Sequence, residues 1–152
     1  MPRLESLPED FANLLRNMPG PSVGDTPWAS AGPARERRIA IVTTAGIHRR
    51  GDTPFSLNDG DYRVLPAEAR DELVMSHVSP NVDRAGFAED VNLVFPIDRL
   101  RELEAQGEIG SLAELHYSFM GATMADRMRE PAQGLAKHLH ADGVTGVLLV
   151  PV

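Results

Sequence analysis

The chain has 152 residues, of which 42 % are hydrophobic and 24 % charged, as in an ordinary globular protein with a buried core. Its formal net charge of −7 argues against general nucleic-acid binding. The absence of cysteine excludes disulfides, thiolate metal sites and cysteine nucleophiles within these residues. No apolar run approaches the roughly 20 residues of a membrane span. Acidic residues also interrupt the start of the chain where a signal peptide needs an apolar stretch, so we predict a cytoplasmic protein.

The first 36 residues predict a short helix followed by a linker. Pro8 suits a first helical turn, and Glu9 and Asp10 favour the positive end of the helix dipole. A stretch rich in proline, glycine and serine follows, which is typical of a linker. We therefore expect an N-terminal helix and linker over residues 1–36 and one α/β domain over residues 37–152.

Apolar runs that predict strands recur along residues 37–152. Residues 39–42 are apolar on both faces, which indicates a central parallel strand covered by helices. A second short strand is expected within residues 71–77, and residues 90–96 predict a third strand or an extended segment. The apolar stretch over residues 144–152 predicts a final strand.

Two amphipathic helices are expected between these strands. Ile97, Leu100 and Leu103 recur at helical spacing. A later helix is predicted to begin at Pro131 and to end before Gly143. Strands that alternate with helices predict an α/β fold with a mainly parallel sheet and flanking helices, Rossmann-like or flavodoxin-like. No helix is expected after the final strand, so the sheet is predicted to be incomplete at the C-terminus.

Polar side chains gather where the predicted strands end. His48 follows the first strand, and His77 and Asp83 follow the second. Ligands of open α/β sheets bind beyond the carboxyl ends of the strands, so these side chains and His116 are candidate catalytic residues. Such a group, with Asp83 or Asp90, could move protons or bind a divalent metal. The alternative, that each histidine satisfies backbone groups of its loop, stays open, and no tight metal-binding spacing is present.

Other motifs give little support for a bound cofactor. The sequence lacks a phosphate-binding loop, a full dinucleotide fingerprint and the G-x-S-x-G nucleophile motif. Aspartates in the long polar loop over residues 47–66 lack the order of a calcium loop. Loops of that length in a compact domain are usually functional or disordered. The cofactor and the metal content therefore stay unassigned.

Several segments together resemble a known family. "VTTAGIHRRGDTPF", "VMSHVSPNVDRAG", "EDVNLVFPIDRLRELEAQGEIGSL" and "HYSFMGA" occur in the order seen in the selenoprotein B subunits of glycine, sarcosine, betaine and D-proline reductases. The likeness covers about residues 39–152, and "FPIDRLREL" and "SFMG" are its most specific parts. It implies an oxidoreductase that acts on a small amino-acid-like or amine substrate.

The resemblance also implies a mechanism. In characterised members a selenolate attacks the carbon that bears the amine, and for glycine and proline a pyruvoyl group of a partner subunit holds the substrate nitrogen. The selenocysteine or cysteine lies just after an apolar strand like "GVTGVLLVPV". This chain contains neither residue. We therefore hypothesise that it is the front half of a longer protein, either ended at a UGA codon read as stop or cut there deliberately. Sequencing the DNA beyond Val152 tests this hypothesis.

Two functions from different classes follow from these observations. The first is a reductase-family oxidoreductase, or the N-terminal part of one, with His48, His77, Asp83 and His116 lining a substrate pocket. The second is a noncatalytic subunit that binds a small ligand or a partner subunit, which the absence of cysteine favours. An exposed apolar strand would also favour a homodimer. Neither function includes nucleic acid or a membrane.

Overall fold

The computed structural model describes residues 3–18, 29, 32–80 and 82–152, and the expected linker lies largely outside them. The chain begins with a 3-10 helix, η1 (Leu4–Ser6), and the predicted N-terminal helix, α1 (Glu9–Arg16). None of the helices in the described part of the chain has the length and apolar content that a membrane crossing requires. The remaining elements are η2 (Ala34–Glu36), β1 (Arg38–Thr43), β2 (Ile47–Arg49), β3 (Arg63–Pro66), η3 (Ala67–Glu72), β4 (Leu73–Met75), α2 (Arg84–Glu89), η4 (Val91–Leu93), α3 (Ile97–Ala105), β5 (Ser111–Leu112), β6 (Leu115–Ser118), α4 (Ala125–Ala141) and β7 (Gly146–Val150).

The main sheet is built around β1, as the apolar run at residues 39–42 predicts. β7 pairs with β1 in parallel along its whole length, and β5 and β6 pair in parallel with its other edge. β3 joins antiparallel to β6 and forms an outer edge. The fold is therefore mixed α/β with a mostly parallel sheet, and β3 makes it a mixed sheet rather than a purely parallel one.

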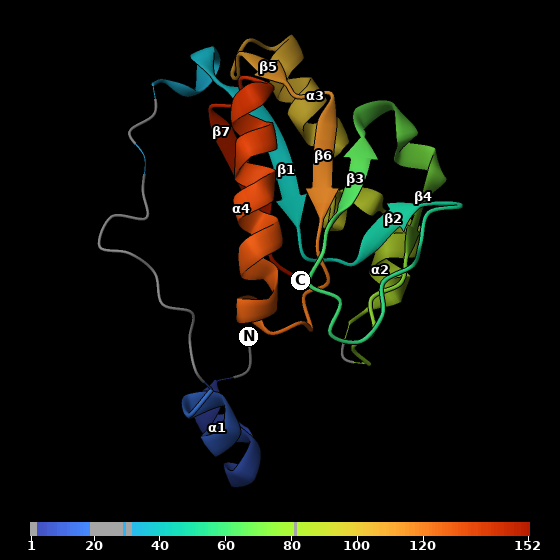
Figure 1. Ribbon diagram of the computed structural model, residues 1–152, viewed down its shortest axis with the longest axis vertical. Helices are drawn as coiled ribbons and strands as arrows, with labels where there is room; N and C mark the ends of the chain where they lie inside the picture. Colours follow the sequence, from blue (N-terminus) through green and yellow to red (C-terminus); the bar gives the residue numbers. More distant parts are fainter. Residues whose placement is uncertain (1–2, 19–28, 30–31, 81) are drawn as a thin grey trace.

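A second, smaller sheet consists of β2 and β4. The two strands pair antiparallel, with Ile47 opposite Met75 and His48 opposite Val74. The strand predicted within residues 71–77 thus exists, but it pairs outside the main sheet. Figure 1 shows this pair beyond β3, on the side of the molecule away from β7.

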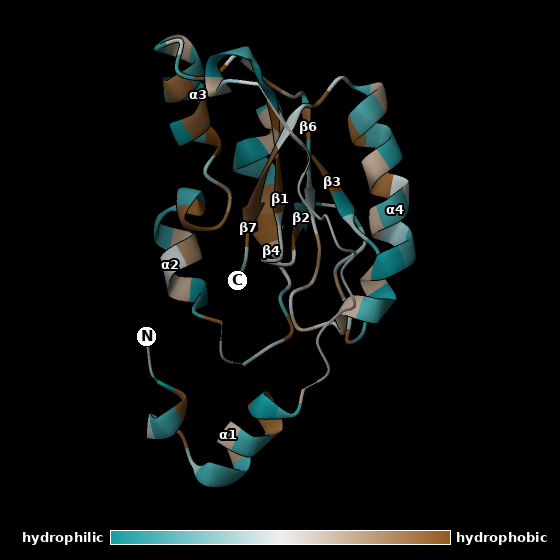
Figure 2. Ribbon diagram, turned by 90° about the vertical axis from the view of Figure 1, so that its left-hand side faces the viewer, coloured by the Kyte–Doolittle hydropathy of each residue, from teal (hydrophilic) through white to brown (hydrophobic). Residues whose placement is uncertain are grey.

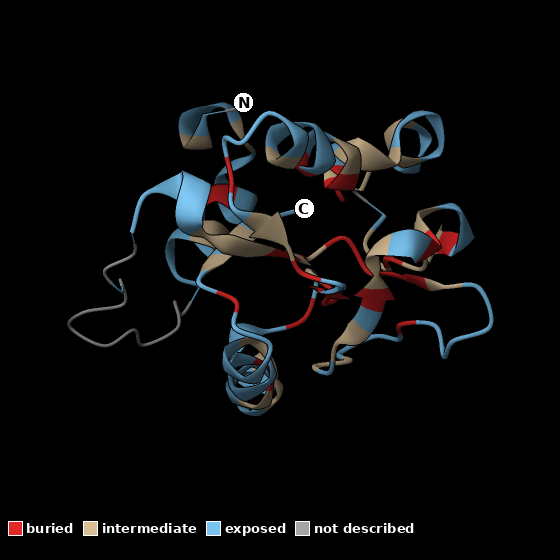
Figure 3. Cartoon of the chain, turned by 90° about the horizontal axis from the view of Figure 1, so that it is seen from above, coloured by how far each residue is buried: buried red, intermediate tan, exposed pale blue. Residues whose placement is uncertain are grey.

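Helices cover both faces of the main sheet. α4 lies on one face, whereas α2 and α3 lie on the other (Figure 2). The largest apolar cluster lies between the sheet and α3, and the buried segments run through the middle of the molecule (Figure 3). Its fully buried members include Ile41, Ile47, Leu65, Phe95 and Ile97.

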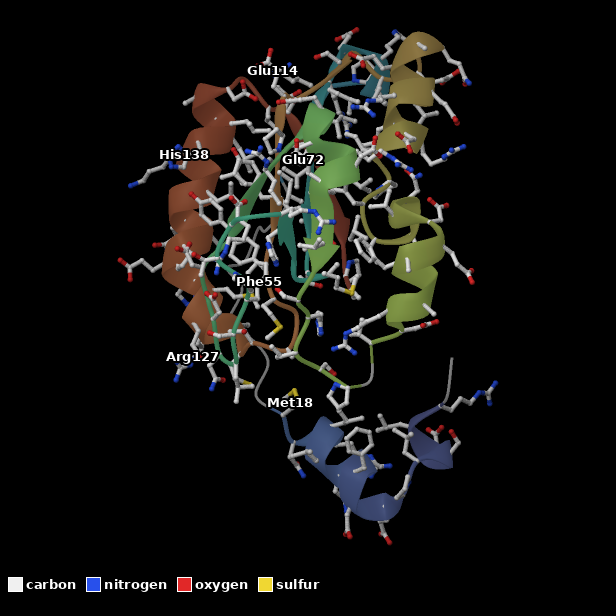
Figure 4. All side chains as sticks on the ribbon, turned by 90° about the vertical axis from the view of Figure 1, so that its right-hand side faces the viewer. Met18, Phe55, Glu72, Glu114, Arg127 and His138 are labelled. Carbon is white, nitrogen blue, oxygen red and sulfur yellow. The ribbon has the colours of Figure 1, made fainter. Side chains whose placement is uncertain are left out.

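Helix α4 begins at Ala125, six residues before the predicted start at Pro131, so this prediction was wrong. Pro131 has no N–H to donate to the carbonyl of Arg127. Gly60 lies against that carbonyl, and a Cβ added at Gly60 would stand 2.4 Å from the Arg127 oxygen. Figure 4 shows Arg127 at the end of α4 that meets the loop after β2. The loop can approach α4 this closely because residue 60 has no side chain.

Within residues 90–96, where a third strand or extended segment was predicted, Val91–Leu93 form the helical turn η4. Asp90 caps this turn by accepting the N–H of Asn92 (2.9 Å). The side-chain oxygen of Asn92 accepts the N–H of Asp98 (3.0 Å), and Asp98 accepts the guanidinium of Arg70 (2.7 Å). The turn is stable because side chains satisfy the backbone groups that a strand would pair with a neighbour.

Arg63 makes several of the contacts that hold the long polar loop after β2 in place. The Arg63 guanidinium donates to Asp59 (2.7 Å) and to the carbonyl of Thr53 (2.9 Å). It also lies 4.4 Å from the ring centre of Phe55, in a cation–π contact. Phe55 is buried between α4 and the strands (Figure 4). The loop is therefore an ordered part of the body, and β3 continues directly from it.

Candidate functional site

His116 lies on β6 and replaces a missing backbone hydrogen bond. Ile39 of β1 lies opposite Leu112 of β5, and Val42 of β1 lies opposite Tyr117 of β6. Between these two pairs the chain advances three residues on β1 but five residues from β5 to β6, so the β5–β6 side has two extra residues. At this break the Nδ1 atom of His116 accepts the N–H of Ile41 (3.0 Å).

The surroundings of His116 are apolar. The side chain is fully buried, its ring meets Phe95 edge-on at 5.4 Å, and its Nε2 has no hydrogen-bond partner among the described residues. Burial, assisted by the charges of Arg101 and Arg38, lowers the pKa of His116 to about 4. The ring is therefore neutral at physiological pH and carries its proton on Nε2.

His48 lies on β2 and faces the ordered loop. Its Nδ1 lies 2.8 Å from the carbonyl of Arg49, and its ring meets Phe55 edge-on at 6.5 Å. Ser76, on the neighbouring strand's continuation, accepts the N–H of Phe55 through its hydroxyl (2.8 Å). These contacts tie the loop to the β2–β4 pair.

Asp83 is the N-cap of α2, and its carboxylate accepts the N–H of Ala85 (2.9 Å). The next residue, Arg84, donates to the carbonyls of His77 and Ser79. The polar stretch after β4 is thus an organised turn that leads into a helix.

His77, like His116, has one buried ring nitrogen without a hydrogen-bond partner in the described part of the chain, but His77 lies beside the loop after β1. It is 3 % exposed, and its Nδ1 accepts the N–H of Ser79 (3.1 Å). The proton must then lie on Nε2, which is buried and has no hydrogen-bond partner among the described residues. Burial, together with the nearby charge of Arg84, lowers the pKa of His77. His77 is therefore neutral, and its buried Nε2–H donor has no acceptor among the described residues.

The backbone around His77, which follows β4, touches the loop after β1 at the carboxyl-terminal edge of the main sheet. We call this edge, formed by the loops after β1, β6 and β7, the rim. Gly46, three residues beyond β1, has a positive φ of 63°. A Cβ there would lie 3.0 Å from the Cα of His77, so the two loops touch. The N–H of Gly46 also donates to the carbonyl of Phe119, which follows β6 (2.9 Å).

The end of β7 joins the same rim. The N–H groups of Gly121 and Val152 donate to the carbonyl and the hydroxyl of Thr44, each at 2.8 Å. A Cβ at Gly121 would stand 2.7 Å from the Val152 carbonyl. The segments after β1, β6 and β7 therefore meet at the edge where the carboxyl ends of these parallel strands lie.

Sequence reasoning missed two kinds of residue at this rim. Gly46 and Gly121 allow the close approach of the loops, and Ser118 accepts the N–H of Ile47 through its hydroxyl (3.0 Å). Their signal in the sequence is weak, because a glycine or serine beside a strand has many uses.

The four predicted site residues are not joined to one another. No hydrogen bond or ion pair links any two of His48, His77, Asp83 and His116 in the described part of the chain. Among residues 3–18, 29, 32–80 and 82–152, no three histidine, cysteine, aspartate or glutamate side chains form a group that could hold a metal ion. The rim thus offers one buried donor rather than a metal-ligand set.

Comparison with known proteins identifies the family. The family model of glycine/sarcosine/betaine reductase selenoprotein B matches residues 27–152. The chain is 34 % identical over 119 residues to D-proline reductase subunit gamma of Acetoanaerobium sticklandii, covering 76 % of this chain and 48 % of that protein. It is 32 % identical over 118 residues to sarcosine reductase complex component B subunit beta of Peptoclostridium acidaminophilum, covering 74 % of this chain and 27 % of that protein.

A third relative is glycine reductase complex component B subunit gamma of Carboxydothermus hydrogenoformans, which is 28 % identical over 137 residues. That match covers 86 % of this chain and 30 % of the relative. The chain thus spans about half the length of the first relative and less than a third of the other two. No solved structure matches the chain. Since the family model covers most of the sequence, the chain belongs to the glycine/sarcosine/betaine reductase selenoprotein B family.

Proposed function

We propose that this chain forms part of a reductase B subunit that acts on a small amine substrate bearing a carboxylate, and that His77 donates a hydrogen bond to that carboxylate. The buried and unpartnered Nε2–H of His77 at the strand-end rim carries the proposal. Because the lowered pKa keeps the ring neutral, the interaction with a carboxylate is a hydrogen bond rather than a full ion pair.

The reacting thiol or selenol is not among these residues, since the chain has no cysteine. In this proposal it comes from other polypeptide of the complex, consistent with the names of the relatives as components of reductase complexes. In this proposal His48 and Asp83 have a structural role, because each contacts a backbone group of its own segment. His116 also has a structural role, because its ring accepts the N–H of Ile41 and packs against Phe95 within the sheet.

A matched pair of substitutions tests the role of His77. His77→Asn keeps an acceptor for the Ser79 N–H near the Nδ1 position but removes the Nε2 donor. His77→Gln places an amide N–H near the Nε2 position. Calorimetric titration with glycine, betaine and D-proline should show binding that His77→Asn weakens at least tenfold and His77→Gln retains in part. Equal affinities of both variants and the natural chain would refute a substrate role for His77.

A noncatalytic binding subunit is the second candidate, and the missing cysteine favours it. The two candidate functions predict different turnover in a reconstituted reductase complex. If His77 contacts the substrate, His77→Asn reduces the turnover of a reconstituted reductase complex without dissociating it. If the chain serves assembly alone, turnover follows the amount of complex formed and is independent of the side chain at position 77.

A further inference from the structure

Strand β7 has the composition of an internal strand but stands at an edge. Its sequence is GVLLV, without a charged residue or a proline, and in the described part of the chain it pairs with β1 alone. Exposed edge strands are usually protected by charge, proline, a bulge or a covering segment. A run that is apolar on both faces is typical of a strand with neighbours on both sides.

The backbone of β7 is ready to accept a further strand. The N–H of Thr44 donates to the Val150 carbonyl (3.0 Å), so Val150 turns its backbone groups toward β1. Because backbone groups alternate along a strand, Val147 and Leu149 turn theirs toward the open edge. The side chains of these two residues are 42 % and 68 % exposed.

An apolar groove lies on each side of β7. The groove toward α4 has a volume of about 380 Å³, and the groove toward α3 about 240 Å³. Figure 2 shows β7 between the helix layers that border them. The first groove is lined by Ala136, Leu139, Val144, Val147 and Leu149, among others, and the second by Ile39, Leu100, Leu103, Ile109 and Leu148.

We propose that β7 and its two grooves bind an α/β segment of the same family, whose strand extends the sheet and whose apolar side chains fill both grooves. The relatives support this occupant, since 48 % of the D-proline reductase subunit gamma and 27 % of the sarcosine reductase component are matched and the rest is further polypeptide. A second copy of this chain is the weaker choice, because a net charge of −7 on each copy opposes self-association. The proposal does not depend on the role of His77.

The test uses this chain and a separately expressed probe, the part of the Acetoanaerobium sticklandii D-proline reductase subunit gamma outside the matched region. Light scattering after gel filtration should show a monomer for the chain alone and a one-to-one complex with the probe. Hydrogen exchange should show new protection of the Val147 and Leu149 amides in the complex. Leu149→Glu should weaken the complex at least tenfold, the scale expected for losing one buried leucine side chain.

The matched control is Leu57→Glu, because Leu57 is 72 % exposed in the loop after β2, away from β7. It should leave the complex unchanged, and thermal melts should show that both variants are folded. Failure to form a complex, or protection outside β7, would overturn the proposal. A dimer of the chain alone that Leu149→Glu dissociates would also overturn it, since a second copy would then occupy the edge.

Discussion

The clearest quantitative prediction concerns His116, whose buried ring accepts the N–H of Ile41. The pKa is about 4 in the folded protein against an ordinary value of 6.5. Above pH 6.5 the ring is neutral in both states and contributes no pH dependence. As the pH falls from 6.5 to 4, the unfolded chain takes up a proton and the folded chain does not, so folding becomes less favourable. At about 1.4 kcal/mol per tenfold change, the full loss is about 3 kcal/mol.

Two variants separate the titration from the hydrogen bond. His116→Phe keeps an aromatic ring but leaves the buried N–H of Ile41 unsatisfied, which destabilises by about 1–3 kcal/mol at pH 7.5. His116→Asn supplies an oxygen that can accept that N–H but leaves a smaller side chain. Neither variant titrates at this position, so each should show less acid destabilisation than the natural chain.

Urea unfolding followed by circular dichroism at pH 7.5 and pH 4.5 measures the effect. The natural chain should lose about 2–3 kcal/mol more than His116→Phe between these pH values. The lowered pKa of His77 acts in the same direction in both proteins and therefore cancels. An equal loss in the natural chain and in His116→Phe would refute the assignment of a buried, neutral histidine at the break between β5 and β6.

Two further substitutions, each with a control elsewhere in the chain, test the loop and its contact with α4. Arg63→Met should destabilise the fold by about 1–3 kcal/mol, because the side chain of its ion-pair partner Asp59 is only 16 % exposed and would lose its partner. Hydrogen exchange over residues 50–62 should also become faster. The control Arg99→Met, which breaks an exposed ion pair, should change stability by less than about 1 kcal/mol. Gly60→Ala should destabilise by at least about 2 kcal/mol in urea unfolding, because its Cβ would stand 2.4 Å from a backbone oxygen. Gly134→Ala, in α4 with nothing within 4 Å, should instead stabilise by about 0.5–1 kcal/mol, and the opposite order of the two glycine variants would contradict the packing described.

Local signals in the sequence were sufficient for the elements with strong periodicity. The apolar runs at β1 and β7 and the leucine spacing of α3 are visible without any neighbour, and these elements occur as predicted. The start of α4 could not be found this way, because a proline usually opens a helix, whereas Pro131 lies inside α4. The finer Rossmann-like or flavodoxin-like assignment stays a prediction.

For the site too, features within a short stretch of sequence could be predicted, whereas contacts between residues far apart in the sequence could not. The loops after β1, β6 and β7 meet at the carboxyl ends of these strands, whereas His48 lies on β2 and His77 follows β4, both in the separate antiparallel sheet. The sequence could not assign a partner to each histidine, since the partner of His116 is Ile41, 75 residues earlier. The motif "FPIDRLREL", which carried much of the family resemblance, holds Asp98 in a structural network with Asn92 and Arg70.

Structural residues and candidate site residues at the rim therefore differ in whether their polar side-chain atoms already have a hydrogen-bond partner. Thr43, Thr44 and Ser118 all lie at the rim, and each hydroxyl accepts a backbone N–H. These residues hold the loops of the rim in place, because their hydroxyl groups are already bonded to the backbone. His77 retains an unused donor at the same rim, and it contacts the glycine that connects the loops after β1 and β6. A buried donor without a partner is unfavourable by itself, and both His77 and His116 have one. The contact of His77 with Gly46, beside the meeting loops, is the reason that the proposed substrate contact is assigned to His77.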